Sequence, residues 1–161
     1  MVIWIIGKTG SGKTLFGKQI YKKLSLKKRC FLLDGDDIRY YLNNDLGFSL
    51  NDRKINSLRI QKLCNFLEIK GFVVICCIQS LFKTHQKKNR NLFKKYLQIY
   101  IKVTNQVMYN KKFKFKKKKK NIVGKDILFP EPYKSDIILL NDYSDKTKKI
   151  NFLLKKIKQK L

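Results

Sequence analysis

The chain has 161 residues, 43% of them hydrophobic, and its 38 Lys and Arg residues outnumber 11 acidic residues to give a net charge of +27. This length fits one domain, 1–161, and the hydrophobic content excludes a disordered chain. No apolar run approaches the ~20 residues that a membrane span requires, and the N-terminus lacks a signal-peptide pattern, so we expect a cytoplasmic protein without a membrane partner.

Short apolar runs alternate with segments of helical spacing. Strands are predicted at Val2–Ile6, Cys30–Leu33, Phe72–Ile78, Leu97–Val103 and Ile137–Leu140. Helices are predicted from Thr14 to about Leu24, from Asp52 to about Lys70, at Thr84–Phe93 and at Lys146–Leu161. Continuous apolar strands between helices indicate a mostly parallel five-stranded sheet covered on both faces, a three-layer α/β architecture. Ligands of such folds bind at the carboxyl ends of the strands.

Apolar residues recur at helical intervals in three of these helices, and we expect them to face the core. They are Leu15, Ile20 and Leu24 in the first helix, Ile55, Leu58, Leu63, Phe66 and Leu67 in the second, and Ile150, Leu153, Leu154 and Ile157 in the last.

The strongest motif is GKTGSGKT, Gly7–Thr14, which matches GxxxxGK[ST] in full between a predicted strand and a predicted helix. Its glycines let the backbone N–H groups face phosphate oxygens, and the following helix presents its positive end. Lys13 can reach the β- and γ-phosphates of ATP, and Thr14 can ligate Mg²⁺. The motif predicts a P-loop NTPase fold, with ATP and Mg²⁺ bound by the eight residues Gly7, Lys8, Thr9, Gly10, Ser11, Gly12, Lys13 and Thr14.

A second motif, LDGDDIR at Leu33–Arg39, follows the second strand. A carboxylate at this edge, from Asp34 or Asp36, can orient Mg²⁺ or accept a proton from an attacking hydroxyl. Arg39 can pair with an anionic group of an acceptor. Asp36 or Asp37 can equally serve as the N-cap of a helix, and the residues alone leave both interpretations open.

GKTGSGKT, LDGDDIR, DLGFSLNDRKIN and a strand that ends in serine occur in this order, and together they resemble the adenylylsulfate kinase family over about residues 1–104 and again at 121–132. The resemblance implies a kinase that transfers the γ-phosphate of ATP to the 3′-hydroxyl of adenylylsulfate. Asp36 matches the acidic residue beside that hydroxyl and a Mg²⁺ ligand. Ser80 matches a serine described as a phosphoserine intermediate in some members, although in-line transfer needs no protein nucleophile. The candidate catalytic residues are therefore Lys13, Asp36 and Ser80.

The resemblance also implies an acceptor site. Arg39, Arg53 and Asn56 match residues that bind the phosphosulfate, and Phe48 matches an aromatic residue that packs on the acceptor base. The full set of candidate substrate-binding residues is Asp34, Asp36, Arg39, Phe48, Arg53, Asn56, Gln79, Ser80 and Lys125. Without the resemblance, Arg53 would be interpreted as a surface ion pair with Asp52 or Asp45, and Phe48 as ordinary packing.

Three features depart from the family pattern. Ser80-Leu81 stands for Ser-Pro, YNKKFKFKKKKKN replaces the usual lid within residues 105–132, and NIVGKDILFPEP replaces the usual acceptor segment. A similar replacement occurs in family members of surface-polysaccharide pathways, one of which resembles a cytidine diphosphoramidate kinase. The acceptor could therefore be another nucleotide conjugate, and an inactive, basic nucleotide- or nucleic-acid-binding protein is a further alternative.

The charge itself has two interpretations. The chain contains 33 Lys, only 5 Arg and no alanine, which is typical of A/T-rich codon usage, whereas a dedicated polyanion site favours Arg. We therefore expect no specific nucleic-acid partner; a homodimer is left open. The four cysteines include no CxxC pair, which argues against zinc. Cys76 and Cys77 should point to opposite faces of one strand, and His85 is interpreted as an incidental, exposed residue.

Overall fold

The computed structural model describes residues 1–42, 44–103, 121, 123, 124 and 126–161. Five strands form one sheet in the order β2-β3-β1-β4-β5, and each neighbouring pair is parallel. The strands are β1 (Val2–Ile6), β2 (Cys30–Asp34), β3 (Val73–Ile78), β4 (Tyr96–Lys102) and β5 (Ile137–Leu140). The helices are α1 (Lys13–Leu24), α2 (Gly35–Tyr41), α3 (Leu50–Ile69), α4 (Lys83–Leu92) and α6 (Lys146–Lys158).

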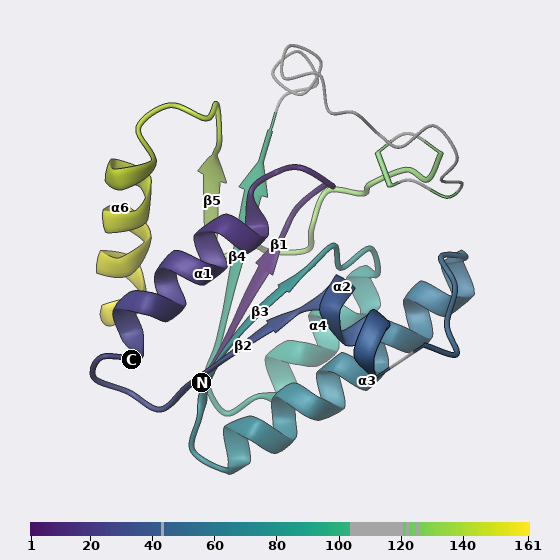
Figure 1. Cartoon of the computed structure of the whole chain (residues 1–161), viewed down its shortest axis with the longest axis horizontal. Coiled ribbons are helices and arrows are strands. Elements are labelled where there is room, and N and C mark those ends of the chain that lie inside the picture. The colour runs from purple at the N-terminus through teal and green to yellow at the C-terminus, as the bar shows by residue number, and fades with distance from the viewer. Residues whose placement is uncertain (43, 104–120, 122, 125) are drawn as a thin grey trace.

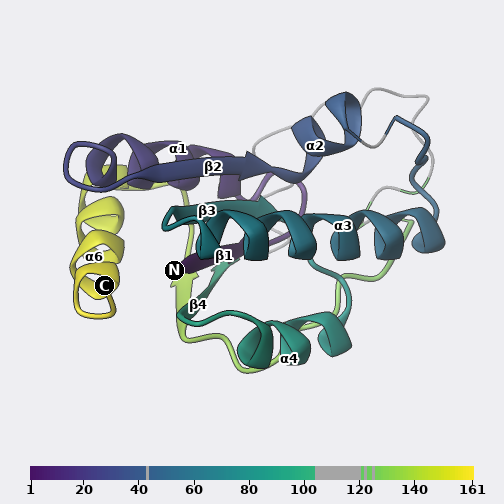
Figure 2. The same cartoon turned by 90° about the horizontal axis from the view of Figure 1, so that it is seen from below.

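Helices cover both faces of the sheet. α1 and α6 lie on one face, and α3 and α4 lie on the other, while α2 follows the carboxyl end of β2 (Figures 1 and 2). The strands β1 and β3 are buried along their whole length, because side chains of both orientations meet a helix layer. The predicted three-layer α/β fold is confirmed, and within the described residues the sheet is entirely parallel.

Each face of the sheet has its own apolar cluster. Ile3 and Ile5 of β1 pack with α1 and α6, whereas Trp4 packs with residues of α3 and with Phe93. Cys77 belongs to the first cluster and Cys76 to the second, so the prediction that they point to opposite faces is confirmed. All four cysteines are free.

The buried face of α1 differs from the predicted one. Leu15 is 39% exposed, while Phe16, Gly17 and Ile20 are buried. Gly17 permits a close approach between α1 and β3, because a Cβ placed there would lie 2.2 Å from Cys77 Sγ. The expected position of Leu15 in the core is wrong because the helix turns this tighter, glycine-containing face to the sheet.

The buried face of α3 is also different. The helix begins at Leu50 and not at Asp52, because Ser49 and Asp52 form a capping box in which each side chain bonds the other's backbone N–H. Leu67 is buried as predicted, but Phe66 is exposed. The buried residues include Asn56, Ser57 and Gln61 besides Ile60, Cys64 and Leu67. The N-terminal half of this face is polar because Asn56 and Ser57 line a cavity at the carboxyl edge of the sheet.

The helix α2 was not predicted from the sequence, whereas α6 agrees with its prediction. α2 has no counterpart among the predicted helices, and its N-cap is Asp34, whose side chain accepts a hydrogen bond from the backbone N–H of Asp36 at 3.0 Å. The interpretation of Asp36 or Asp37 as the cap is therefore wrong. α6 buries Leu153, Leu154 and Ile157 as predicted, and Ile150 packs against the same cluster.

The lysine run at residues 111–120 and Lys125 lie outside the described residues. In the part of the chain that the structure describes, no helix combines the length and apolar character that a membrane crossing requires.

Candidate active site

The loop Gly7–Thr14 connects β1 to α1 at the carboxyl edge of the sheet. Gly10 and Gly12 have φ values of 78° and 96°, a left-handed region that glycine enters at little cost. Lys13 begins α1, and its Nζ donates to the carbonyl oxygen of Lys8 at 2.8 Å. The amine of Lys13 therefore lies against the loop that would bind a phosphate.

Side chains from other elements brace this loop. Gln79, directly after β3, donates to Thr9 Oγ1 at 2.7 Å. After β5, Asn141 donates to the carbonyl of Ser11 at 2.9 Å, and Tyr143 Oη donates to the carbonyl of Gly10 at 2.6 Å. The loop conformation is thus fixed by three side chains that follow β3 and β5, two strands whose ends the parallel topology places at the same edge of the sheet. The sequence analysis missed Asn141 and Tyr143; their position after the last parallel strand was the only signal that could have indicated them.

Oxygen ligands meet where α1 and α2 begin. Thr14 Oγ1 donates to Asp34 Oδ2 at 2.6 Å, and the other oxygen of Asp34 caps α2. Asp36 is exposed and borders the same cavity. The site therefore presents one hydroxyl and two carboxylates, the hard oxygen donors that Mg²⁺ prefers.

Two arginines, Arg39 and Arg53, also line this cavity, and both lie close to the ring of Phe48. The Cζ atoms of Arg39 and Arg53 lie 5.1 and 5.6 Å from the ring centroid of Phe48. Arg39 is buried and donates to the carbonyl of Gly47. Arg53 donates to the carbonyls of Phe48 and Asn121 and to Gln79 Oε1, at 3.0, 2.9 and 2.6 Å. The alternative pairing of Arg53 with Asp45 is wrong, because Asp45 pairs with Arg59.

Most of the predicted site residues line one cavity of about 390 Å³. They are Thr9, Gly10, Gly12, Lys13, Thr14, Asp34, Asp36, Arg39, Arg53, Asn56, Gln79 and Ser80. Gly7, Lys8 and Ser11 support the phosphate loop but are not among the lining residues, and Phe48 contacts the cavity through its two arginines. The structure therefore places donor and acceptor candidates around one cavity.

His85 is not the exposed residue that the sequence suggested. It is 6% exposed, and its Nδ1 lies 3.0 Å from Ser57 Oγ, which lines the cavity. Burial lowers the pKa of His85, with Lys54 and Lys88 acting in the same direction. Ser57 was also missed by the sequence analysis, because a serine within a helix carries no motif.

Burial changes the ionisation of several groups in the cavity. It lowers the pKa of Lys13, partly offset by the carboxylates Asp36 and Asp34. It also lowers the pKa values of Arg39 and Arg53, although guanidinium groups remain protonated in proteins. Burial raises the pKa of Cys77 to about 12, so its thiol stays neutral. The cavity is thus cationic on the side of the arginines and carboxylate-lined at the end of β2.

The sequence matches the family described as adenylylsulphate kinase over residues 1–140. The chain belongs to the adenylylsulphate kinase family. The adenylyl-sulfate kinase of Thermodesulfovibrio yellowstonii is 34% identical over 170 positions, which cover 99% of this chain and 84% of that protein. The cytidine diphosphoramidate kinase of Campylobacter jejuni is 32% identical over 164 positions, covering 97% and 95%.

A solved structure agrees with this assignment at the level of the fold. The APS kinase of Mycobacterium tuberculosis, in complex with AMPPNP and APS, superposes with a TM-score of 0.86 at 23% identity, covering 98% of this chain and 96% of that one. Membership of the adenylylsulphate kinase family makes the chain an ATP-dependent phosphotransferase with the P-loop kinase fold. The predicted family, fold and enzyme class are therefore confirmed.

Proposed function

We propose that this adenylylsulphate kinase family member transfers the γ-phosphate of ATP to the 3′-hydroxyl of adenylylsulfate, giving 3′-phosphoadenylylsulfate. The observation that carries the proposal is the single cavity of about 390 Å³, lined both by the phosphate loop and by Arg39 and Arg53. Kinases gain most of their rate by positioning two substrates and stabilising charge. A cavity that is lined by an ATP-binding loop and by two arginines can bring a phosphate donor and an anionic acceptor together.

The donor half consists of Gly7–Thr14. Its backbone N–H groups and the N-terminus of α1 would hold the phosphates. Lys13 would stabilise negative charge on the transferring group. Thr14 and Asp36 are the proposed Mg²⁺ ligands, with Asp34 beside Thr14. Mg²⁺ in kinases bridges and neutralises phosphate oxygens, and commonly uses one or two carboxylates plus substrate phosphates, which fits this donor set.

The acceptor half consists of Arg39, Arg53, Asn56, Phe48 and Ser80. The two guanidiniums would bind the anionic phosphosulfate, and the ring between them would pack on the acceptor base. Asp36 lines the same cavity as Lys13, Arg39 and Arg53. It is therefore the proposed base or orienting group for the 3′-hydroxyl. Gln79 would connect the two halves, while the role of Lys125 stays a prediction.

A second acceptor is supported by a specific observation. The cytidine diphosphoramidate kinase of C. jejuni is 32% identical and aligns over 95% of its length, nearly the identity of the adenylyl-sulfate kinase relative. A kinase for a cytidine conjugate would use the same donor loop and the same arginines. Only the base pocket near Phe48 and segment 121–132 would have to differ.

Measurement of ADP release tests this function. The protein with ATP, Mg²⁺ and adenylylsulfate should release ADP and form one product phosphorylated at the 3′-position. Lys13→Ala should lower kcat by at least about 100-fold while the far-ultraviolet circular dichroism stays unchanged, because it removes charge stabilisation from the transferring group. Equal turnover by Lys13→Ala and wild type would refute the assignment of the donor site.

A further inference from the structure

Ser80 lies at the cavity in an unusual backbone conformation. It follows β3, is 4% exposed and has a φ of 52°. A non-glycine residue reaches this left-handed region only at an energetic cost, and it persists there when its surroundings hold it. The contacts of Ser80 therefore identify what fixes the wall of the cavity.

Two buried side chains donate hydrogen bonds to Ser80. The indole Nε1 of Trp4 donates to Ser80 Oγ at 3.1 Å, and the amide Nε2 of Gln86 donates to the Ser80 carbonyl at 2.7 Å. Both Trp4 and Gln86 are fully buried. An oxygen that accepts the indole hydrogen can still donate its own hydrogen. Ser80 lines the cavity, and its hydroxyl hydrogen is not used in the bond with Trp4.

The other end of the Gln86 amide reaches a different part of the chain. Its Oε1 accepts from the backbone N–H of Tyr133 at 2.6 Å. Tyr133 directly follows segment 121–132, whose first residue, Asn121, accepts a hydrogen bond from Arg53 of the acceptor half. The side chain of Gln86 in α4 therefore connects Ser80, a residue of the acceptor half, to Tyr133, the residue that follows this segment.

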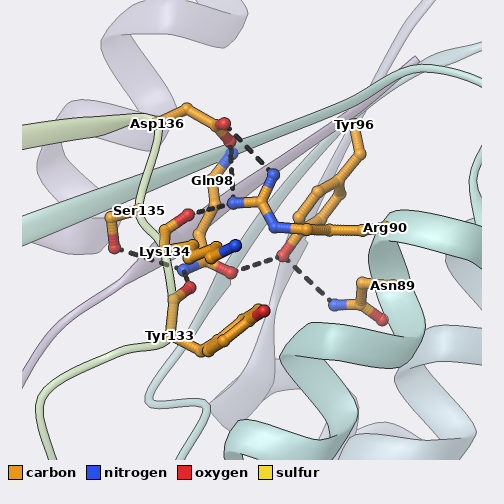
Figure 3. Close-up of polar contacts among 8 residues, drawn as sticks. All are labelled: Asn89, Arg90, Tyr96, Gln98, Tyr133, Lys134, Ser135 and Asp136. Carbon is orange, nitrogen blue, oxygen red and sulfur yellow. Dashed lines mark hydrogen bonds and ion pairs between the residues drawn. The ribbon is translucent and has the colours of Figure 1, made fainter.

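Tyr133 is itself firmly placed. Gln98 of β4, also fully buried, donates its amide to the Tyr133 carbonyl at 2.7 Å and its backbone N–H to Asp136 at 2.7 Å. Arg90 of α4 pairs with Asp136 at 3.1 Å (Figure 3). Since Tyr133 is anchored independently of Gln86, its N–H offers Gln86 a fixed point from which the amide can hold Ser80.

We propose that Gln86 is a positioning residue for the acceptor: its amide holds Ser80 and Tyr133 at a fixed separation, so that acceptor affinity and turnover depend on it and donor binding does not. The kinetic part rests on the proposed function. The structural part, that Gln86 fixes Ser80, does not.

Gln86→Met tests the proposal, since it keeps the length of the side chain and removes both hydrogen bonds. The acceptor KM should rise at least about fivefold, because a buried carbonyl and a buried N–H lose their partners, while the Kd for ADP stays within about twofold. Gln86→Asn keeps an amide that is one methylene too short to reach both partners, and should give an intermediate acceptor KM.

Leu153→Ala is the control for a loss of stability alone. Leu153 is as buried as Gln86, but it lies in α6 and packs in the apolar cluster on the other face of the sheet. This variant should lower the melting temperature at least as much as Gln86→Met, because it leaves a cavity in the core, and it should leave the acceptor KM unchanged. Equal increases of the acceptor KM in Gln86→Met and Leu153→Ala would mean a merely structural role and overturn the proposal.

A second readout is independent of the acceptor's identity. Trp4 is the only tryptophan of the chain, and its indole donates to Ser80, so its fluorescence reports on that bond. The emission maximum should shift in Gln86→Met and Gln86→Asn but not in Leu153→Ala, because Leu153 belongs to the apolar cluster on the face of the sheet away from Trp4. An unchanged emission in Gln86→Met overturns the proposal even if adenylylsulfate proves not to be a substrate. A shifted emission supports it in that case, and only the proposed function then fails.

Discussion

Arg53 is the residue that joins the most parts of the site. Three of its five N–H groups bond to Phe48, Asn121 and Gln79. These bonds hold the guanidinium in place, and its remaining two N–H groups can donate to an anion. A charge that is already ordered costs little further entropy when it binds its ligand.

Arg53→Ala should therefore raise the acceptor KM by roughly 10- to 150-fold and change the KM for ATP little, since a charge-assisted contact to a buried anion contributes about 1.5–3 kcal/mol. Arg59→Ala is the control, because Arg59 lies on the same helix in an exposed pair with Asp45, and solvent-exposed ion pairs contribute little to stability. Steady-state kinetics with each substrate varied decide the matter. A rise in the KM for ATP as large as that for the acceptor would contradict the assignment.

At the scale of elements, the seating of α1 on β3 positions the phosphate loop. The helix begins at Lys13, so a shift of its axis would move the amine and the loop together. The close approach at Gly17, where an added Cβ would lie 2.2 Å from Cys77 Sγ, sets that seating.

Gly17→Ala should destabilise the protein by about 1–3 kcal/mol, because the added methyl group overpacks a filled interior. Cys77→Ala in the same chain should recover part of that loss, because it removes the sulfur that the methyl group meets. Urea denaturation of both single variants and the double variant measures the coupling. Strictly additive changes in the free energy of unfolding would show that the two side chains do not compete for the same space.

The sequence was informative wherever a residue's role depends on its immediate neighbours. Continuous apolar strands and the motif GKTGSGKT predicted the sheet, its helical layers and the donor loop. The seven-residue helix α2 is too short to show apolar periodicity. The polar half of α3, the burial of His85 and the bonds of Tyr143 to the loop depend on tertiary contacts. Residues brought together only by topology leave no local pattern to detect.

At the scale of the whole molecule, the net charge of +27 does not require a nucleic-acid partner. Lysines along α6 and elsewhere lie on exposed positions, and a diffuse positive surface attracts polyanions without selecting among them. Whether the chain forms a homodimer stays open.

Duplex DNA should therefore bind weakly and without sequence preference, with a Kd of about 10⁻⁴ to 10⁻⁶ M at physiological salt, and the affinity should fall steeply as salt is raised. Fluorescence anisotropy with two unrelated duplexes over a salt series measures both properties. Nanomolar binding to one duplex but not to the other at physiological salt would instead favour a dedicated nucleic-acid site.

The central claim is that the shared cavity selects adenylylsulfate as the acceptor. The most direct test is a competition in which adenylylsulfate and cytidine diphosphoramidate are present together with ATP and Mg²⁺, and both phosphorylated products are quantified by mass spectrometry. The product ratio gives the ratio of the two kcat/KM values. Adenylylsulfate should have the larger kcat/KM. A kcat/KM for the cytidine conjugate at least about tenfold above that for adenylylsulfate would contradict adenylylsulfate as the acceptor, although the fold and the donor site would still stand.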